Sequence, residues 1–152
     1  MPANTSPIFA LTPNVGEVKI TTTAALVRSD GSAANAIGTD QFLAFTAGAN
    51  GSFVQRVRFI PVASAAAVNS VATTLRVFLS TVNTGTPTAT NTHLLAEISV
   101  PIISAANSTA AATYYEIPLN IAIPANNYIL VSQHIAQTTN QSWQAIVFGG
   151  DY

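Results

Sequence analysis

The sequence predicts an all-β protein, an antiparallel β-sandwich that is jelly-roll-like with about eight strands. Short segments rich in β-branched and aromatic residues recur along the chain, and clusters of Gly, Pro, Asn, Ser and Thr separate them. No segment has the apolar spacing of a convincing amphipathic helix. Frequent strands without intervening helices argue against a parallel sheet and favour two antiparallel sheets packed face to face. An immunoglobulin-like sandwich is the nearest alternative, which the strand count leaves open.

The strands are predicted from alternation of apolar and polar side chains. In residues 17–28, Val18, Ile20 and Leu26 share one parity while Lys19 and Thr21 share the other, which is typical of a half-buried strand. The eight predicted strands are residues 17–28, 40–46, 53–62, 73–82, 93–100, 114–121, 128–135 and 142–148.

Turn chemistry marks the connections. Residues 47–52, which contain Asn50-Gly51, are the clearest candidate for a hairpin. The Thr-rich residues 83–92 are predicted to be an exposed loop.

The chain is predicted to divide into an extended N-terminal arm, residues 1–16, and a single β-sandwich domain, residues 17–152. Pro2, Pro7 and Pro13 disfavour a regular ladder in the arm. The arm also carries apolar residues, which either cap the core of the same domain or dock onto a neighbouring subunit. These residues are Ile8, Phe9 and Leu11.

Composition favours assembly. Hydrophobic residues make up 49% of the chain and charged residues only 7%, against a usual charged fraction of roughly 25%. The surface must therefore rely on the 26 Ala, 19 Thr and 12 Asn. A net charge of −1 gives little repulsion between copies, so association with itself or a partner is expected. The chain has no Cys, which excludes disulfides and fits assembly in a reducing cytosol. No apolar run approaches the length of a membrane span, so no membrane partner is predicted.

The titratable residues form no recognisable catalytic or metal-binding motif. His93 and His134 have no carboxylate or second imidazole at ligand spacing, and Glu97 and Glu116 stand alone in the sequence. No nucleophile elbow or phosphate-binding Gly loop is present. The sequence therefore predicts a protein that is not an enzyme and has no metal or cofactor.

Three of the five cations lie on the outward parity of two consecutive strands. Arg56, Arg58 and Arg76 could form a basic stripe, but with a pI near 6 the electrostatic attraction that dominates nucleic-acid binding is largely missing. We expect them to pair with Glu97 or Glu116, either across strands or between subunits.

The aromatic residues allow a second hypothesis. Trp143, with Tyr114, Tyr115 and Tyr128, would form a sugar-stacking platform if these rings were exposed together. Packing in the core explains Trp143 more simply.

Three stretches of the chain are distinctive: Leu-Arg-Val-Phe-Leu-Ser-Thr at residues 75–81, Ile-Pro-Ala-Asn-Asn-Tyr-Ile-Leu-Val-Ser at 123–132, and Ser-Trp-Gln-Ala-Ile-Val-Phe-Gly-Gly-Asp-Tyr at 142–152. They resemble virion structural proteins of tailed bacteriophages, most closely small capsid decoration, or cement, proteins. The resemblance covers residues 53–152. It implies a β-sandwich that trimerises on the outside of the head and clamps neighbouring major capsid subunits, without catalytic residues. It also implies that extended termini lie across the capsid or a neighbour.

The resulting hypothesis is a non-enzymatic capsid decoration subunit on the exterior of a virion that is assembled in the host cytoplasm. Its expected partners are copies of itself, as a trimer, and the major capsid protein, with no nucleic acid and no membrane. A phage tail, fibre or head-spike component and a carbohydrate-binding module are the alternatives. The candidate capsid or subunit interface comprises Pro7, Ile8, Phe9, Leu11, Arg56, Arg58 and Arg76.

Overall fold

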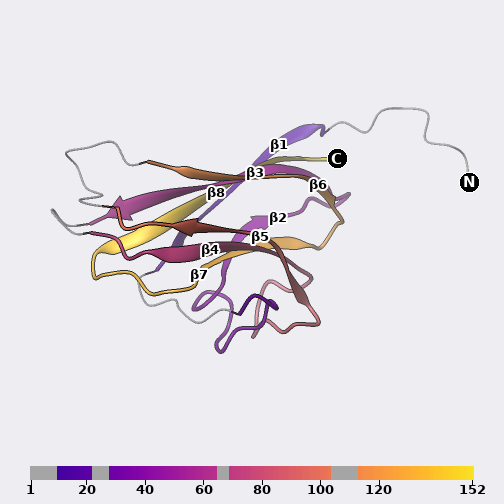
Figure 1. The fold of residues 1–152 in the computed structure, drawn as a ribbon. Helices are drawn as coiled ribbons and strands as arrows, with labels where there is room; N and C mark the ends of the chain where they lie inside the picture. The colour runs from indigo at the N-terminus through magenta and orange to yellow at the C-terminus, as the bar shows by residue number, and fades with distance from the viewer. Residues whose placement is uncertain (1–9, 22–27, 65–68, 104–112) are drawn as a thin grey trace, which may run out of the picture.

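The computed structural model describes residues 10–21, 28–64, 69–103 and 113–152, and within them the chain forms strands and no helix (Figure 1). The strands are β1 Thr12–Ile20, β2 Phe42–Thr46, β3 Ser52–Ala63, β4 Thr73–Ser80, β5 Thr92–Val100, β6 Tyr115–Ile123, β7 Tyr128–Gln133 and β8 Gln141–Asp151. The described residues thus contain no helix long and apolar enough to cross a membrane.

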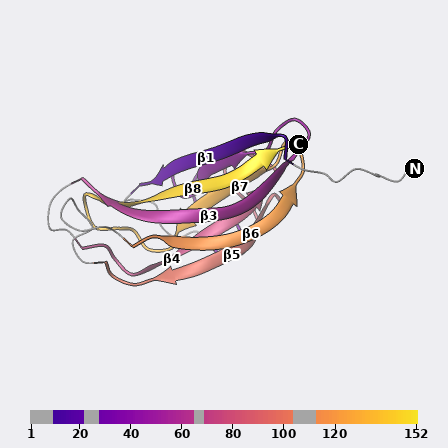
Figure 2. The ribbon, with the colours of Figure 1, turned by 90° about the horizontal axis from the view of Figure 1, so that it is seen from above.

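The strands form two four-stranded antiparallel sheets. The first sheet has the order β1-β8-β3-β6 and the second the order β2-β7-β4-β5. Figure 2 shows the strands of the first sheet side by side in this order, in front of the second sheet. Strand β1 pairs with β8, β2 with β7, β3 with β6 and β4 with β5. This is the pairing of a long antiparallel hairpin folded over on itself, so the sandwich is a jelly roll and the predicted fold class is confirmed.

The core lies between the two sheets. Alternate residues of β3, β4 and β8 point into it, and Val57, Phe59, Leu75, Val77 and Trp143 are completely buried there. The sequence predicts this alternation for these residues. The complete burial of Trp143 confirms the simpler of its two predicted roles, which is packing in the core. The ring of Tyr115 meets Trp143 edge to face, with centroids 5.9 Å apart.

Strand β1 differs most from its prediction. It runs from Thr12 to Ile20 rather than over residues 17–28, so the predicted arm overlaps it at residues 12–16, and residues 22–27 lie outside the described chain. Pro13 is accommodated because β1 is an edge strand, where one side of the backbone needs no ladder hydrogen bonds. Pro118 sits in β6, the other edge of the same sheet.

The predicted hairpin at residues 47–52 is wrong in its pairing. The turn exists, with the amide of Gly51 donating to the carbonyl of Gly48 at 3.0 Å and Gly51 at a φ of 89°. However, β2 belongs to the second sheet and β3 to the first. The turn therefore carries the chain from one sheet to the other, because turn residues determine a reversal and not the partner of the strand that follows.

A candidate interaction surface

The outer face of the second sheet is covered by the chain itself. Phe78 and Leu130 point away from the main core, yet both are completely buried, because Ala33 and Ile37 from the β1–β2 connection pack against them. The amides of Ala33 and Ile37 donate to the carbonyls of Pro87 and Gly85, which ties this connection to the β4–β5 loop. Both connections lie below the second sheet in Figure 1. We call this outer surface the covered face.

The outer face of the first sheet has no such cover among the described residues, and we call it the open face. Its apolar members include Val15, 59% exposed, and the half-buried Phe53, Ile60, Ile146 and Phe148. The side chains that define the open face are Val15, Glu17 and Lys19 on β1, Phe53, Arg56, Arg58 and Ile60 on β3, Glu116 and Pro118 on β6, and Gln144, Ile146 and Phe148 on β8.

Charge is concentrated on the open face. The chain has only five Lys or Arg and six Asp or Glu. Five of these eleven lie on the open face, namely Glu17, Lys19, Arg56, Arg58 and Glu116. A chain that otherwise avoids charge therefore places nearly half of it on one apolar sheet surface.

The two arginines of β3 share one carboxylate. Arg58 donates from Nε to Oε1 of Glu116 at 2.7 Å, and its Nη2 lies 2.6 Å from the same oxygen. The Nε of Arg56 lies 3.3 Å from that oxygen as well. The predicted pairing of these arginines with Glu116 across strands is confirmed, since β3 and β6 are neighbours and Arg58 is directly opposite Glu116.

Aromatic rings hold both guanidinium groups in place. The guanidinium of Arg56 lies 4.4 Å from the centre of the Phe148 ring, and that of Arg58 lies 4.4 Å from the centre of the Tyr114 ring. Such stacking fixes planar cations while leaving donors directed outward. Sequence reasoning missed Phe148 and Tyr114 in this role, although the opposite parity of Phe148 to Trp143 and Val147 was a signal that its ring points out of the core.

Arg76 belongs to the other sheet. Its Nε donates to Oε2 of Glu97 at 2.9 Å, directly across the β4–β5 pair, as predicted. Its Nη1 also lies 3.2 Å from Nδ1 of His134, and because a guanidinium only donates, that ring nitrogen accepts. The three predicted arginines are thus divided between the two outer surfaces and form no single stripe.

The apolar arm is only partly described. Leu11 is 82% exposed and its amide donates to the carbonyl of Asp151 at 2.7 Å. Pro7, Ile8 and Phe9 lie outside the described residues, so their role as an interface stays a prediction. The chain enters the described part beside a groove of about 320 Å³ at the end of the open face, which Ala10, Val15, Phe53 and Phe148 help to line.

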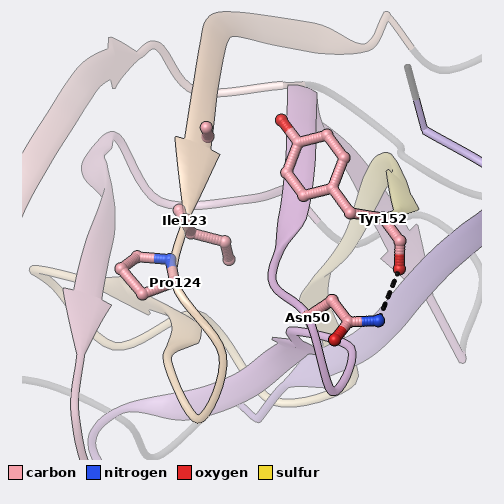
Figure 3. Close-up of a pocket in the computed structure, with 5 residues that line it drawn as sticks. Asn50, Ile123, Pro124 and Tyr152 are labelled. Atoms are coloured by element: carbon pink, nitrogen blue, oxygen red, sulfur yellow. Dashed lines mark hydrogen bonds between the residues drawn. The ribbon is translucent and has the colours of Figure 1, made fainter. Parts of the chain in front are cut away.

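One pocket of the described chain lies near the C-terminal residue (Figure 3). It measures about 470 Å³ and is lined by Asn50, Ala122, Ile123, Pro124 and Tyr152. The side-chain amide of Asn50 donates to the carbonyl of Tyr152 at 3.3 Å. Among the described residues that line this pocket there is no Asp, Glu, His, Lys or Arg.

The described residues contain no group of three or more His, Cys, Asp or Glu that could hold a metal ion. His93 is exposed on β5, and His134 contacts Arg76. Of the aromatic residues in the carbohydrate hypothesis, only Tyr114 is strongly exposed, at 54%. Tyr128 packs against Phe78 and Leu130. The described part of the chain therefore has no row of exposed rings for stacking sugars.

A polar network closes the end of the first sheet. Asn14 donates from Nδ2 to both carboxylate oxygens of Asp151, at 2.9 and 3.1 Å, and Ser52 donates its hydroxyl to the same group. These two donors hold the pKa of Asp151 below its usual value of 3.8. The network links the end of β8 to β1 through Asn14 and to β3 through Ser52.

Comparison with known proteins gives no family. No protein-family model matches the chain, and no curated protein matches it either. Among solved structures, a chain of the cyanophage Pam1 capsid asymmetric unit is 14% identical over the whole of both chains, with a TM-score of 0.41. A chain of the infectious bursal disease virus particle is 14% identical over 99% of this chain and 36% of its own, with a TM-score of 0.33. Dimeric latent PorU from Porphyromonas gingivalis is 10% identical over 97% of this chain and 14% of its own, with a TM-score of 0.32. The chain thus spans about a third or less of the last two proteins, and at these TM-scores none of the three carries an argument about its function.

Proposed function

We propose that this protein is a non-enzymatic structural subunit of a virion, a decoration or cement subunit that binds the outer surface of the capsid lattice and stabilises the head. The observation that carries the proposal is the open face. It is a sheet surface with large apolar side chains, stacked arginines and no cover from the described chain, in a protein of which only 7% of the residues are charged.

Physical reasoning supports assembly over catalysis. Large exposed apolar surfaces on a folded domain mark contact with another protein. A subunit that attaches at many equivalent positions needs modest contacts, because multivalent attachment turns weak binding into durable binding. An Ala-, Thr- and Asn-rich surface lets crowded identical copies approach without charge repulsion. The stretches that resemble decoration proteins of tailed phages support the same proposal, and that resemblance implies a three-fold arrangement on the shell.

The test is to compare purified particles with and without the protein. We expect electron cryomicroscopy to show external density on the head, at positions of local three-fold symmetry, that disappears when the gene is deleted. Heads that lack the protein should burst at lower temperature or milder osmotic shock. Density on the tail or a fibre would instead support the related role of a tail component, and the absence of the protein from particles would refute a virion role.

A further inference from the structure

Glu17 is unusual among the described carboxylates. Asp30, Asp40, Glu97, Glu116 and Asp151 each accept a hydrogen bond from another side chain, from Ser32, Asn35, Arg76, Arg58 and Asn14 respectively. The carboxylate of Glu17 has no such partner within the described part of the chain, and it is exposed on β1 at the edge of the open face.

On the same face, two strands away from Glu17, the guanidinium groups outnumber the carboxylates. Arg56 and Arg58 both approach Oε1 of Glu116, so one carboxylate serves two guanidinium groups. The Nε of Arg56 is buried and makes no hydrogen bond with acceptable geometry, although it lies 3.3 Å from that oxygen. The Nη1 of Arg56 donates to Oε1 of Gln55 at 2.6 Å. A second carboxylate that reaches the remaining N–H groups would give each guanidinium a carboxylate of its own.

The strand register places the acid and the cations in one row. Glu17 is opposite Ile146, Ile146 is opposite Arg58, and Arg58 is opposite Glu116. Consider a second copy related by a two-fold axis that lies in the contact plane and runs along the boundary between β8 and β3. That axis brings β1 of each copy over β6 of the other without shifting the rows, so Glu17 lies over Glu116 of the other copy, one strand away from Arg58.

We infer that the open faces of two copies pair in this way, with Glu17 of each copy binding the Arg56–Arg58 pair of the other. Packed sheets lie about 10 Å apart, a gap that a glutamate and an arginine span together. Each contact then contains two guanidinium groups and two carboxylates and is neutral. The adjacent row of each sheet reads Val15, Phe148, Arg56 and Pro118 across the four strands. In the pair, Val15 of one copy therefore lies over Pro118 of the other.

The size of the face sets the strength of the contact. Four strands about 4.8 Å apart and about nine residues long cover roughly 600 Å². A pair of faces therefore buries roughly 1,200 Å², the lower end of specific interfaces. We expect a weak dimer that becomes populated when copies are concentrated, as they are on a shell. The inference rests on the proposed function and assigns the open face to contact between copies, so that in the paired state the capsid is contacted through other surfaces of the domain. It gives two-fold pairing where the family likeness implies three-fold.

Sedimentation equilibrium of the purified full chain tests the inference without any particle, so its failure is separate from a failure of the virion role. The wild-type chain should fit a monomer–dimer equilibrium. Glu17→Gln should weaken dimerisation about tenfold, and Glu17→Arg about a hundredfold, because two symmetric contacts are lost or reversed. Asp30→Arg, the same change of charge on the connection that covers the other face, should leave the dimerisation constant unchanged.

Mixing two variants with reversed charges tests the contact between Glu17 and Arg58 specifically. In a mixture of Glu17→Arg with Arg58→Glu, each contact of the mixed dimer joins opposite charges, whereas each variant alone places like charges together. We expect dimers only in the mixture. Circular dichroism and thermal unfolding check that each variant is folded. If repulsion from Glu116 unfolds Arg58→Glu, Arg58→Gln replaces it. Mixed dimers of Glu17→Arg and Arg58→Gln should then regain one contact, between the wild-type Glu17 of one copy and the wild-type Arg58 of the other. A wild-type monomer at all accessible concentrations, a trimer, or equal dimerisation of wild-type and Glu17→Arg would overturn the inference.

Discussion

The two outer faces of this sandwich have similar side chains but differ in whether the described chain covers them. Both carry large apolar side chains that point away from the core, but Phe78 and Leu130 on the covered face are completely buried, whereas Val15 on the open face is 59% exposed. The difference comes from the long β1–β2 connection, whose Ala33 and Ile37 lie on one sheet only. An apolar sheet surface in water favours being covered. The covered face obtains its cover from the β1–β2 connection, whereas none of the described residues covers the open face.

Truncating one phenylalanine on each face should give the largest contrast. Phe78→Ala should lower the free energy of unfolding by about 3–5 kcal/mol, because it leaves a cavity under the covering connection. Phe148→Ala should cost less than about 1.5 kcal/mol in the dilute chain, since its half-buried ring loses mainly its contact with Arg56. Urea denaturation of the two variants measures both. Equal costs would mean that the faces do not differ in this way.

Strand β1 can be tested at the point where it crosses the second sheet. A Cβ added at Gly16 would lie 1.9 Å from the carbonyl oxygen of Ala44, so Gly16→Ala must push the edge of the open face away from the second sheet. We expect a loss of about 1–3 kcal/mol in unfolding free energy. Val15→Ala, one residue earlier and exposed, is the matched control and should cost less than about 0.5 kcal/mol. A stability of Gly16→Ala equal to that of wild type would contradict this placement of β1.

Ion pairs offer a smaller contrast between the faces. Glu116→Gln leaves two stacked guanidinium groups without a carboxylate and should cost about 1 kcal/mol at low salt. Glu97→Gln affects only Arg76, and its side chain is 47% exposed, so the cost should be a few tenths of a kcal/mol. Both costs should shrink in 1 M salt, where charges are screened. A larger cost at Glu97 than at Glu116 would reverse the assignment of the stronger cluster to the open face.

The smallest expected effect is on the free energy of unfolding at acidic pH. The donors Asn14 and Ser52 hold the pKa of Asp151 below its usual value of 3.8 in the folded chain. The unfolded chain therefore binds more protons in this range, and the stabilisation that Asp151 gives is present above the unfolded pKa and lost as the pH falls through the lower folded pKa. Below about pH 4 the wild-type chain should lose stability more steeply than Asp151→Asn. Parallel denaturation curves at pH 6, 4 and 3 would show it, and identical slopes for the two proteins would exclude this role.

Local patterns in the sequence predicted most of the strands and much of their parity. They failed at the bulge between Val54 and Arg56, where Phe53, predicted on the same side as Val57 and Phe59, points outward. All eight predicted strands correspond to observed ones, because the alternation that buries Trp143 and Val57 and exposes Arg58 is a property of each strand alone. The pairing of Arg58 with Glu116 and of Arg76 with Glu97 followed from that parity and the scarcity of other partners.

Local sequence patterns do not predict which strands pair or which connection covers a sheet. Pro13 is tolerated in β1 because that strand is at an edge, which only the sheet order reveals. The turn at Asn50-Gly51 looks like a hairpin but joins two sheets, since pairing is set by residues far away in the sequence. For the same reason the open face could not be predicted: its exposure depends on where the connection containing Ala33 and Ile37 packs.

Hydroxyl-radical footprinting tests most directly whether the open face is a contact surface. The dilute free chain is compared with the same chain bound to purified particles. We expect oxidation of Val15, Phe148 and Tyr114 to fall several-fold on the particle, while His93, exposed on the edge strand of the other sheet, keeps its labelling. Equal labelling of the open face in both states, or protection of the opposite side alone, would contradict the account.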